Sequence, residues 1–90
     1  MLKGTFSADG SSAAKQTSGI LGVPGGNTAY VTGTWGSGTV KVQISPDGTN
    51  WFDVSGATLS ANGAISFTAK GLWRLNLASA TNPSLTYWMV

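Results

Sequence analysis

The sequence predicts an all-β protein: a compact antiparallel β-sandwich of jelly-roll type, preceded by an extended N-terminal arm. From residue 28 onward, apolar and polar residues alternate with the period of two that marks half-buried strands. Turns containing Gly, Asn or Pro interrupt the alternation about every ten residues, which is typical of sandwiches and small barrels. No segment has a sustained helical period. We therefore divide the chain into an arm over residues 1–27 and a core over residues 28–90.

The predicted arm is rich in Ser, Ala and Gly over residues 7–27 and carries one small apolar island, Ile20, Leu21 and Val23. This composition favours an extended arm or a long loop with one short strand. A long structureless stretch in a small domain is usually functional or disordered. Two interpretations remain open: a flexible leader, or an arm that orders against a neighbouring subunit, which the apolar island favours.

The core strands follow from the alternation. Strands are expected around Val40–Ile44, Ile65–Ala69 and Trp73–Leu77, and Phe52 and Val54 should point inward while Asp53 points outward. Between these strands lie segments with the residue types that favour turns, at 36–38, 46–48, 62–63 and 81–83.

The last strand, residues 85–90, is apolar at nearly every position. Leu85, Tyr87 and Met89 should fill the core, which leaves Trp88 and Val90 on the outer side. Because a strand that is apolar on both faces is usually covered on both, either residues 1–25 or another chain should cover this side. The candidate subunit or capsid interface is therefore Ile20, Leu21, Val23, Trp88 and Val90.

The residue types argue against catalysis. The chain has no His, Cys or Glu, so side-chain chemistry is restricted to three Asp, four Lys, one Arg and two Tyr. Asp47 belongs to a turn and Asp53 points outward, so they do not form a facing carboxyl pair. Asp47, Asn50 and Asp53 offer oxygen ligands for Ca²⁺, but two carboxylates would make such a site weak. We expect no enzyme activity, no cofactor and no metal site.

Charge and length indicate the kind of partner. Only 9% of residues are charged, and the net charge of +2 is scattered rather than clustered, so we expect no nucleic-acid partner. No apolar run reaches transmembrane length and the N-terminus has no signal-peptide pattern, so we expect no membrane partner and folding in a cytoplasm. A 90-residue chain without cysteine is expected to gain stability by oligomerisation. Its Ser- and Thr-rich surface suits either a protein interface or simple hydration.

The aromatic residues leave one candidate for surface binding. Trp73 is expected in the core, Trp35 in the core or at its rim, and Trp51 packed on its turn. Trp88 is then the one Trp without an expected place in the core or on a turn. We prefer a protein interface as its role, because Trp is enriched at such interfaces. Sugar stacking is the alternative, and it requires a second aromatic residue on the same exposed face.

Four short motifs resemble those of small virion proteins of tailed bacteriophages. They are a Gly-Thr-Trp strand, a Ser-x-Asp-Gly-Thr-x-Trp hairpin, a Leu-x-Ala-Asn-Gly turn and a late strand with Arg-Leu, here at residues 33–35, 45–51, 59–63 and 73–77. The hairpin also resembles that of discoidin-type sugar-binding domains.

The phage resemblance implies a capsid decoration or cement protein, a head fibre or knob, or a tail component. It also implies a homo-oligomer, most often a trimer, that is located in the virion. Such a protein clamps the shell where copies of the major capsid protein meet, often through an N-terminal arm. The alternative function is a carbohydrate-binding module or the receptor-binding domain of a tail fibre.

Overall fold

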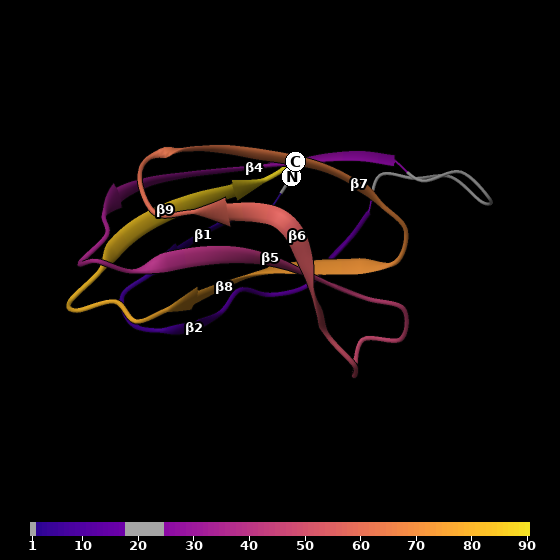
Figure 1. Cartoon of the computed structure of the whole chain (residues 1–90), viewed down its shortest axis with the longest axis horizontal. Coiled ribbons are helices and arrows are strands. Elements are labelled where there is room, and N and C mark those ends of the chain that lie inside the picture. The colour runs from indigo at the N-terminus through magenta and orange to yellow at the C-terminus, as the bar shows by residue number, and fades with distance from the viewer. Residues whose placement is uncertain (1, 18–24) are drawn as a thin grey trace.

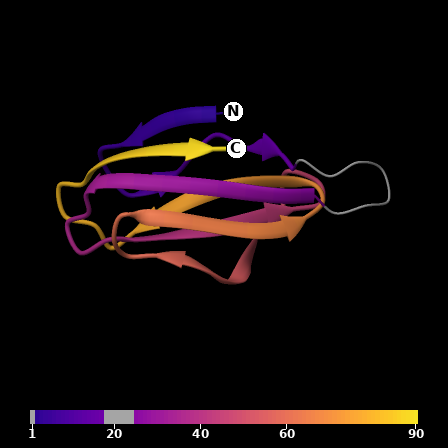
Figure 2. The same ribbon diagram turned by 90° about the horizontal axis from the view of Figure 1, so that it is seen from above.

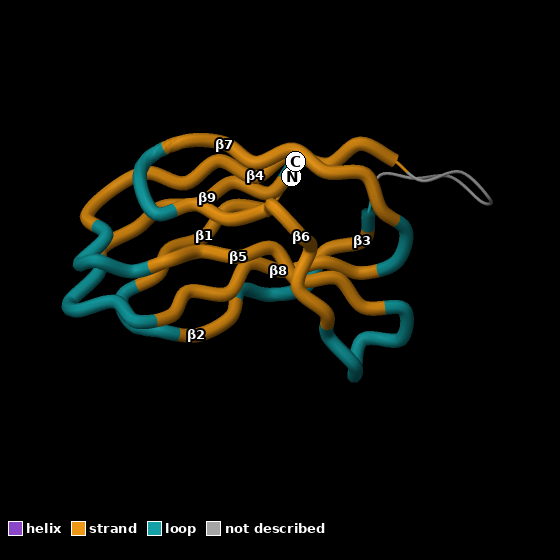
Figure 3. Tube along the Cα trace, viewed as in Figure 1, coloured by secondary structure: helices purple, strands orange, loops and turns teal. Residues whose placement is uncertain are grey.

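Two antiparallel sheets packed face to face form the protein in the computed structural model, which describes residues 2–17 and 25–90. The strands of these residues are β1 (Leu2–Phe6), β2 (Gly10–Ser11), β3 (Lys15–Gln16), β4 (Gly25–Thr34), β5 (Thr39–Ser45), β6 (Phe52–Leu59), β7 (Gly63–Ala69), β8 (Leu72–Ala78) and β9 (Ser84–Met89). The first sheet, here the β1 sheet, has the order β1-β9-β4-β7. The second, the β5 sheet, has the order β2-β8-β5-β6, with β3 also paired to β8 (Figures 1 and 3). The predicted all-β sandwich is confirmed.

The strands pair in reverse order along the chain, as in one long hairpin rolled into two layers. β1 pairs with β9, β2 and β3 pair with β8, β4 pairs with β7, and β5 pairs with β6. Two further pairings, β4 with β9 and β5 with β8, join these hairpins into sheets. With β2 and β3 taken as two parts of one interrupted strand, this is the winding of a jelly roll. Figure 2 looks onto the β1 sheet, where β1, β9, β4 and β7 follow one another in that order.

Residues 2–17 differ from the expected arm, because they supply edge strands to both sheets. β1 pairs with β9 from Leu2 opposite Met89 to Phe6 opposite Leu85, and the chain then crosses to the β5 sheet. β4 begins at Gly25, before the expected boundary at residue 28. Edge strands are often short and poor in apolar residues, so side-chain periodicity does not reveal them. Ile20, Leu21 and Val23 lie outside the described residues.

Side chains from both sheets form one core. Leu85, Tyr87 and Met89 are buried as expected, and Trp73 is fully buried in β8. The rings of Phe67 and Trp73 meet edge to face with their centroids 4.8 Å apart, which is a favourable aromatic geometry between the two sheets. The other buried apolar residues are Phe6, Ala29, Val31, Val40, Val42, Ala57, Ile65, Leu75 and Leu77.

β6 is the irregular strand of the sandwich. Its pairing with β5 shifts register between Lys41 and Gln43, and Gly56 has a φ of 78°. In Figure 1, β6 curves from the β5 sheet toward β7. The expectation that Phe52 points into the core is wrong, because Phe52 is 58% exposed. Phe52 lies opposite the half-buried Ile44, near the end of the sandwich. The alternation of apolar and polar residues predicts which face of a strand is inward, but not where the facing sheet stops covering that face.

Residues 2–17 and 25–90 include no helix that is long and apolar enough to cross a membrane.

Candidate binding surface

The four motifs of the phage resemblance contact one another in two pairs. Asn62 Oδ1, from the Leu-x-Ala-Asn-Gly turn, accepts hydrogen bonds from Gly33 N at 3.0 Å and from Trp35 Nε1 at 2.8 Å in the Gly-Thr-Trp motif. The Arg74 guanidinium lies 4.2 Å from the ring centroid of Trp51, which joins the late strand to the hairpin. Such contacts hold turns and strands together. The motif residues are therefore occupied in maintaining the fold.

The Pro46-Asp47-Gly48 turn uses the carboxylate of Asp47 internally. Asp47 Oδ1 accepts hydrogen bonds from Thr49 N and Asn50 N, both at 2.9 Å, and Oδ2 accepts one from Asn50 Nδ2 at 2.8 Å. These donors hold the pKa of Asp47 well below its ordinary value, the backbone N–H of Asn50 contributing most. Asp47 therefore acts as the acceptor that organises its own turn.

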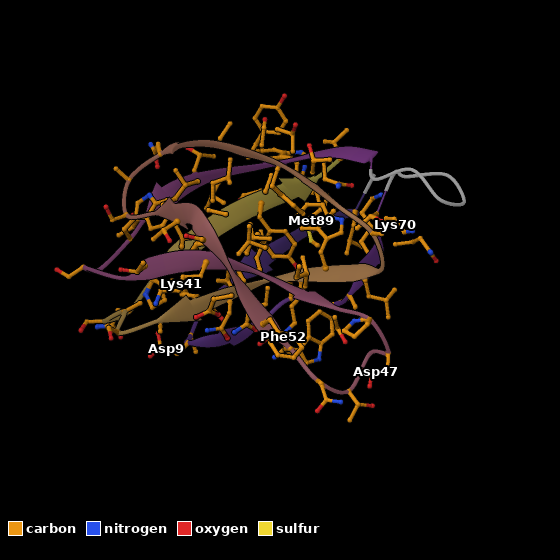
Figure 4. All side chains as sticks on the ribbon, turned by 45° about the vertical axis from the view of Figure 1, so that its right-hand side comes forward. Asp9, Lys41, Asp47, Phe52, Lys70 and Met89 are labelled. Carbon is orange, nitrogen blue, oxygen red and sulfur yellow. The ribbon has the colours of Figure 1, made fainter. Side chains whose placement is uncertain are left out.

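The carboxylates of the described residues are dispersed. Asp53 Oδ1 accepts a hydrogen bond from Gln43 Nε2 at 3.0 Å, and Gln43 Oε1 accepts one from Arg74 Nε at 2.9 Å. Figure 4 shows Asp9 and Asp47 at separate places, with Asp47 near the tip of a protruding loop. No group of three or more His, Cys, Asp or Glu occurs in residues 2–17 and 25–90. This dispersion lends no support to a Ca²⁺ site or to a carboxyl pair.

A row of side chains crosses the outer face of the β1 sheet. The register places Lys3 beside Trp88, Trp88 beside Tyr30, and Tyr30 beside Ala64. Tyr30 is 48% exposed and Trp88 is half-buried. Lys3 Nζ lies 5.4 Å from the centroid of a Trp88 ring, within the range of a cation–π contact. Two aromatic side chains therefore lie next to each other on one solvent-facing surface.

Val90 extends this surface beyond the row. It pairs with Thr28 through two backbone hydrogen bonds of 2.8 and 3.2 Å, and its side chain is 46% exposed. Thr28 Oγ1 in turn lies 3.1 Å from Ser66 Oγ on β7. We name Lys3, Tyr30, Trp88, Val90 and Thr28 together the Trp88 face. It is an apolar and hydroxyl-bearing surface on the side of the β1 sheet that faces away from the core.

The two outer surfaces of the sandwich differ in charge. Lys3 is the only charged residue in the four strands of the β1 sheet, whereas the strands of the β5 sheet contain Lys15, Lys41, Asp53 and Arg74. Removing the Trp88 face from water therefore costs the hydration of at most one charge in these strands. This makes it the better surface for a partner that must exclude water.

Sequence reasoning located part of this surface. Trp88 in β9 and Val90 just after it lie on the outer side of the β1 sheet, as their alternation with the buried Tyr87 and Met89 indicates. Their role as an interface stays a prediction. Residues 2–17 leave the outer side of Trp88 uncovered except at Lys3, since β1 lies beside β9 and β2 and β3 belong to the other sheet. Tyr30 was missed, although its alternation with Val31 was a usable signal.

No protein-family model, no curated protein and no solved structure matches this chain.

Proposed function

We propose that the chain is a non-enzymatic structural protein of a tailed-bacteriophage virion, most specifically a capsid decoration or cement protein. The observation that carries the proposal is the Trp88 face, a surface with adjacent aromatic side chains and a single charge in its strands. The virion setting rests on the motif resemblance, whose residues hold the fold together. The jelly roll is consistent with it by analogy only, because viral capsid and lectin domains share this fold.

The proposed mechanism is thermodynamic. A protein that binds only the assembled shell lowers the free energy of that state by mass action, and many copies add their contributions. Trp and Tyr supply much of the energy of protein interfaces, which assigns the central contact to Trp88 and Tyr30. We place this contact between copies in a homo-oligomer, most specifically a trimer, and the assembled oligomer then binds the major capsid protein.

Light scattering at several concentrations tests the oligomer. A closed oligomer, with Trp88→Ala shifting it toward monomer, is the expected result. Lys41→Ala, a substitution on the exposed face of the other sheet, serves as the matched control and should leave the mass unchanged. A wild-type monomer at every concentration would contradict the proposed assembly.

Co-sedimentation with purified shells of the phage whose genome encodes this chain tests the virion role. The wild-type chain should pellet with the shells to a saturating ratio and raise the temperature at which they release DNA. Trp88→Ala should do neither, while Lys41→Ala should behave as the wild type. Failure of the wild-type chain to co-sediment would contradict a decoration function.

Carbohydrate binding is a second candidate function, favoured by Tyr30. Sugar stacking needs a second exposed aromatic side chain near Trp88, and the register supplies one on the adjacent strand. Hydroxyl groups such as that of Thr28 surround the pair and can exchange hydrogen bonds with sugar hydroxyls. Tryptophan fluorescence during a titration with bacterial surface glycans tests this candidate. A saturable change that Tyr30→Ala removes would favour it over the protein interface.

A further inference from the structure

The outer face of the β5 sheet holds a guanidinium group in a fixed position. Arg74 is half-buried in β8, and its guanidinium lies 4.2 Å from the ring centroid of Trp51. Arg74 Nε donates a hydrogen bond to Gln43 Oε1 at 2.9 Å, and Gln43 Nε2 donates one to Asp53 Oδ1 at 3.0 Å. The ring and the amide therefore hold Arg74 from two sides and leave its terminal nitrogens, Nη1 and Nη2, outside these contacts.

The terminal nitrogens of Arg74 have no acceptor within the described part of the chain. In residues 2–17 and 25–90, Arg74 makes no ion pair and no hydrogen bond other than the one from Nε. The N–H groups of Nη1 and Nη2 lie in one plane, and their spacing matches the two oxygens of a carboxylate. Because Trp51 and Gln43 already restrict the side chain, a ligand that pairs with it loses less conformational entropy. This guanidinium is therefore suited to bind a carboxylate.

The side chains next to Arg74 on this face can exchange hydrogen bonds with hydroxyl groups. Asn76 lies two residues further along β8, about 7 Å away, and is half-buried. Ser11, its partner in β2, donates from Oγ to Asn76 Oδ1 at 2.9 Å, which leaves the other end of the Asn76 amide open. A ligand with a carboxylate on Arg74 and hydroxyl groups on the same ring would bring those hydroxyls to Asn76 and Ser11.

The carboxylate must come from another molecule, because the chain has none to spare. Asp9 and Asp47 accept hydrogen bonds from the backbone of their own turns and of the β8–β9 turn, and Asp53 accepts one from Gln43. Residue 1 and residues 18–24 include no Asp or Glu. A side chain from a second copy of the chain is therefore a poor match for Arg74.

The local charge favours a ligand with a single negative charge. Lys41 lies beside Asn76 in the register and Asp53 lies beside Gln43, so these two opposite charges flank the site and offset each other. The guanidinium of Arg74 remains as the one unbalanced charge. One positive charge suits a carboxylate better than a phosphate, which carries up to two negative charges.

We propose that Arg74, Asn76 and Ser11 form a binding site for an acidic sugar, a uronic acid unit whose carboxylate pairs with the guanidinium. Trp51 and Gln43 are positioning residues that hold Arg74. A sugar fits better than an acidic peptide, because the groups beside Arg74 are an amide and a hydroxyl. The site lies on the opposite sheet from the Trp88 face and does not depend on the function proposed for that face.

The test is a titration of the isotope-labelled full chain with trigalacturonate, followed by nuclear magnetic resonance. Saturable shifts of the Arg74 Nε–H and Trp51 Nε1–H signals are expected, without shifts of the Trp88 indole signal. The methyl ester of the same trisaccharide keeps the hydroxyl groups and removes the charge, so it should leave both signals in place. Equal shifts with the ester, or no saturable shift with trigalacturonate, would overturn the proposal.

Three variants separate a specific site from general attraction of anions. Arg74→Lys keeps the charge but loses the paired donors, so we expect binding about ten-fold weaker or more. Gln43→Glu puts a carboxylate against the guanidinium, and this internal partner should abolish binding while the spectrum verifies the fold. Lys70→Ala removes an exposed cation from the turn between β7 and β8 and should bind as the wild type does. Wild-type affinity in Gln43→Glu or Arg74→Lys would overturn the proposal.

An acidic peptide is the competing ligand. Tetraglutamate with both ends capped presents the same carboxylates on a flexible chain without ring hydroxyls. We expect it to bind more weakly than trigalacturonate at equal carboxylate concentration, and Asn76→Ala should reduce only the binding of the sugar. Tighter binding of the peptide would overturn the assignment to a sugar.

Discussion

Asp9 joins the start of the chain to the turn between β8 and β9, and removing its carboxylate should weaken the whole sandwich. Its two oxygens accept hydrogen bonds from Ser79 N at 3.1 Å and from Ala80 N at 2.9 Å. Ser79 has a φ of 61°, an uncommon conformation that these contacts help to hold. Asp9→Ala deletes both acceptors, whereas Asp9→Asn keeps one acceptor oxygen without the charge.

The expected magnitude follows from the contacts and their exposure. A hydrogen bond to a charged group contributes roughly 1.5–3 kcal/mol, but Asp9 is exposed and the freed N–H groups regain water. We therefore take about 0.5–1 kcal/mol for each hydrogen bond, or about 1–2 kcal/mol for Asp9→Ala. In a domain of this size 1 kcal/mol shifts Tm by about 4–8 °C, so we expect a decrease of about 4–16 °C. Asp9→Asn should lose about half as much.

Urea and thermal unfolding, followed by tryptophan fluorescence, measure this effect. The midpoint should fall while the slope with denaturant stays constant, because the same surface is exposed on unfolding. Asp53→Ala is the control, since Asp53 accepts its hydrogen bond from the Gln43 side chain on an exposed face. A midpoint for Asp9→Ala within about 1 °C of the wild type would refute the reasoning. A lower slope would instead mean that β1 and β2 unfold separately from the core.

Four further substitutions test the turns and the two faces of the last strands. The pKa of Asp47 is lowered by folding, so its ionised form stabilises the protein above about pH 4, and this contribution is lost as the pH falls. The stability difference between wild type and Asp47→Ala should therefore shrink from about pH 7 to about pH 2 in urea titrations. Gly36→Ala should destabilise by more than about 2 kcal/mol in the same assay, because φ is 58° and a Cβ would overlap the carbonyl oxygen of Thr81. At a concentration at which the chains are monomeric, Trp88→Ala should cost about 1 kcal/mol or less, and Leu75→Ala about 2–5 kcal/mol, since only Leu75 is fully buried. Comparable losses in the monomer would contradict the outward placement of Trp88.

Alternation of apolar and polar residues was sufficient to predict the central strands. In β8, Trp73, Leu75 and Leu77 are buried while Arg74 and Asn76 are only half-buried, as a period of two requires. The same rule could not predict β2 and β3, which have two residues each, Gly10–Ser11 and Lys15–Gln16. Their stabilisation comes from backbone pairing with β8 and from side chains such as Asp9. No local pattern in the sequence encodes these contacts.

The candidate surface was only partly predictable for a related reason. Alternation assigns Trp88 and Tyr30 each to the outer face of its own strand. Their proximity depends on the register between β4 and β9, which are separated by most of the chain. Register follows from how the two strands bury their inner faces together. A single strand therefore does not disclose which residue will lie beside Trp88.

The placement of the motifs changes what the phage resemblance can support. Asn62 with Trp35, and Trp51 with Arg74, are contacts that close turns and join strands. A sequence pattern made of such contacts indicates the fold and not the binding partner. Any chain with this rolled hairpin is stabilised by these contacts, whatever it binds. Tyr30 and Trp88 belong to no motif. A related chain that keeps the four motifs but lacks aromatic residues at these two positions should share the sandwich and lose the binding that we propose for the Trp88 face. This binding therefore depends on the outer face of the β1 sheet and not on the motifs.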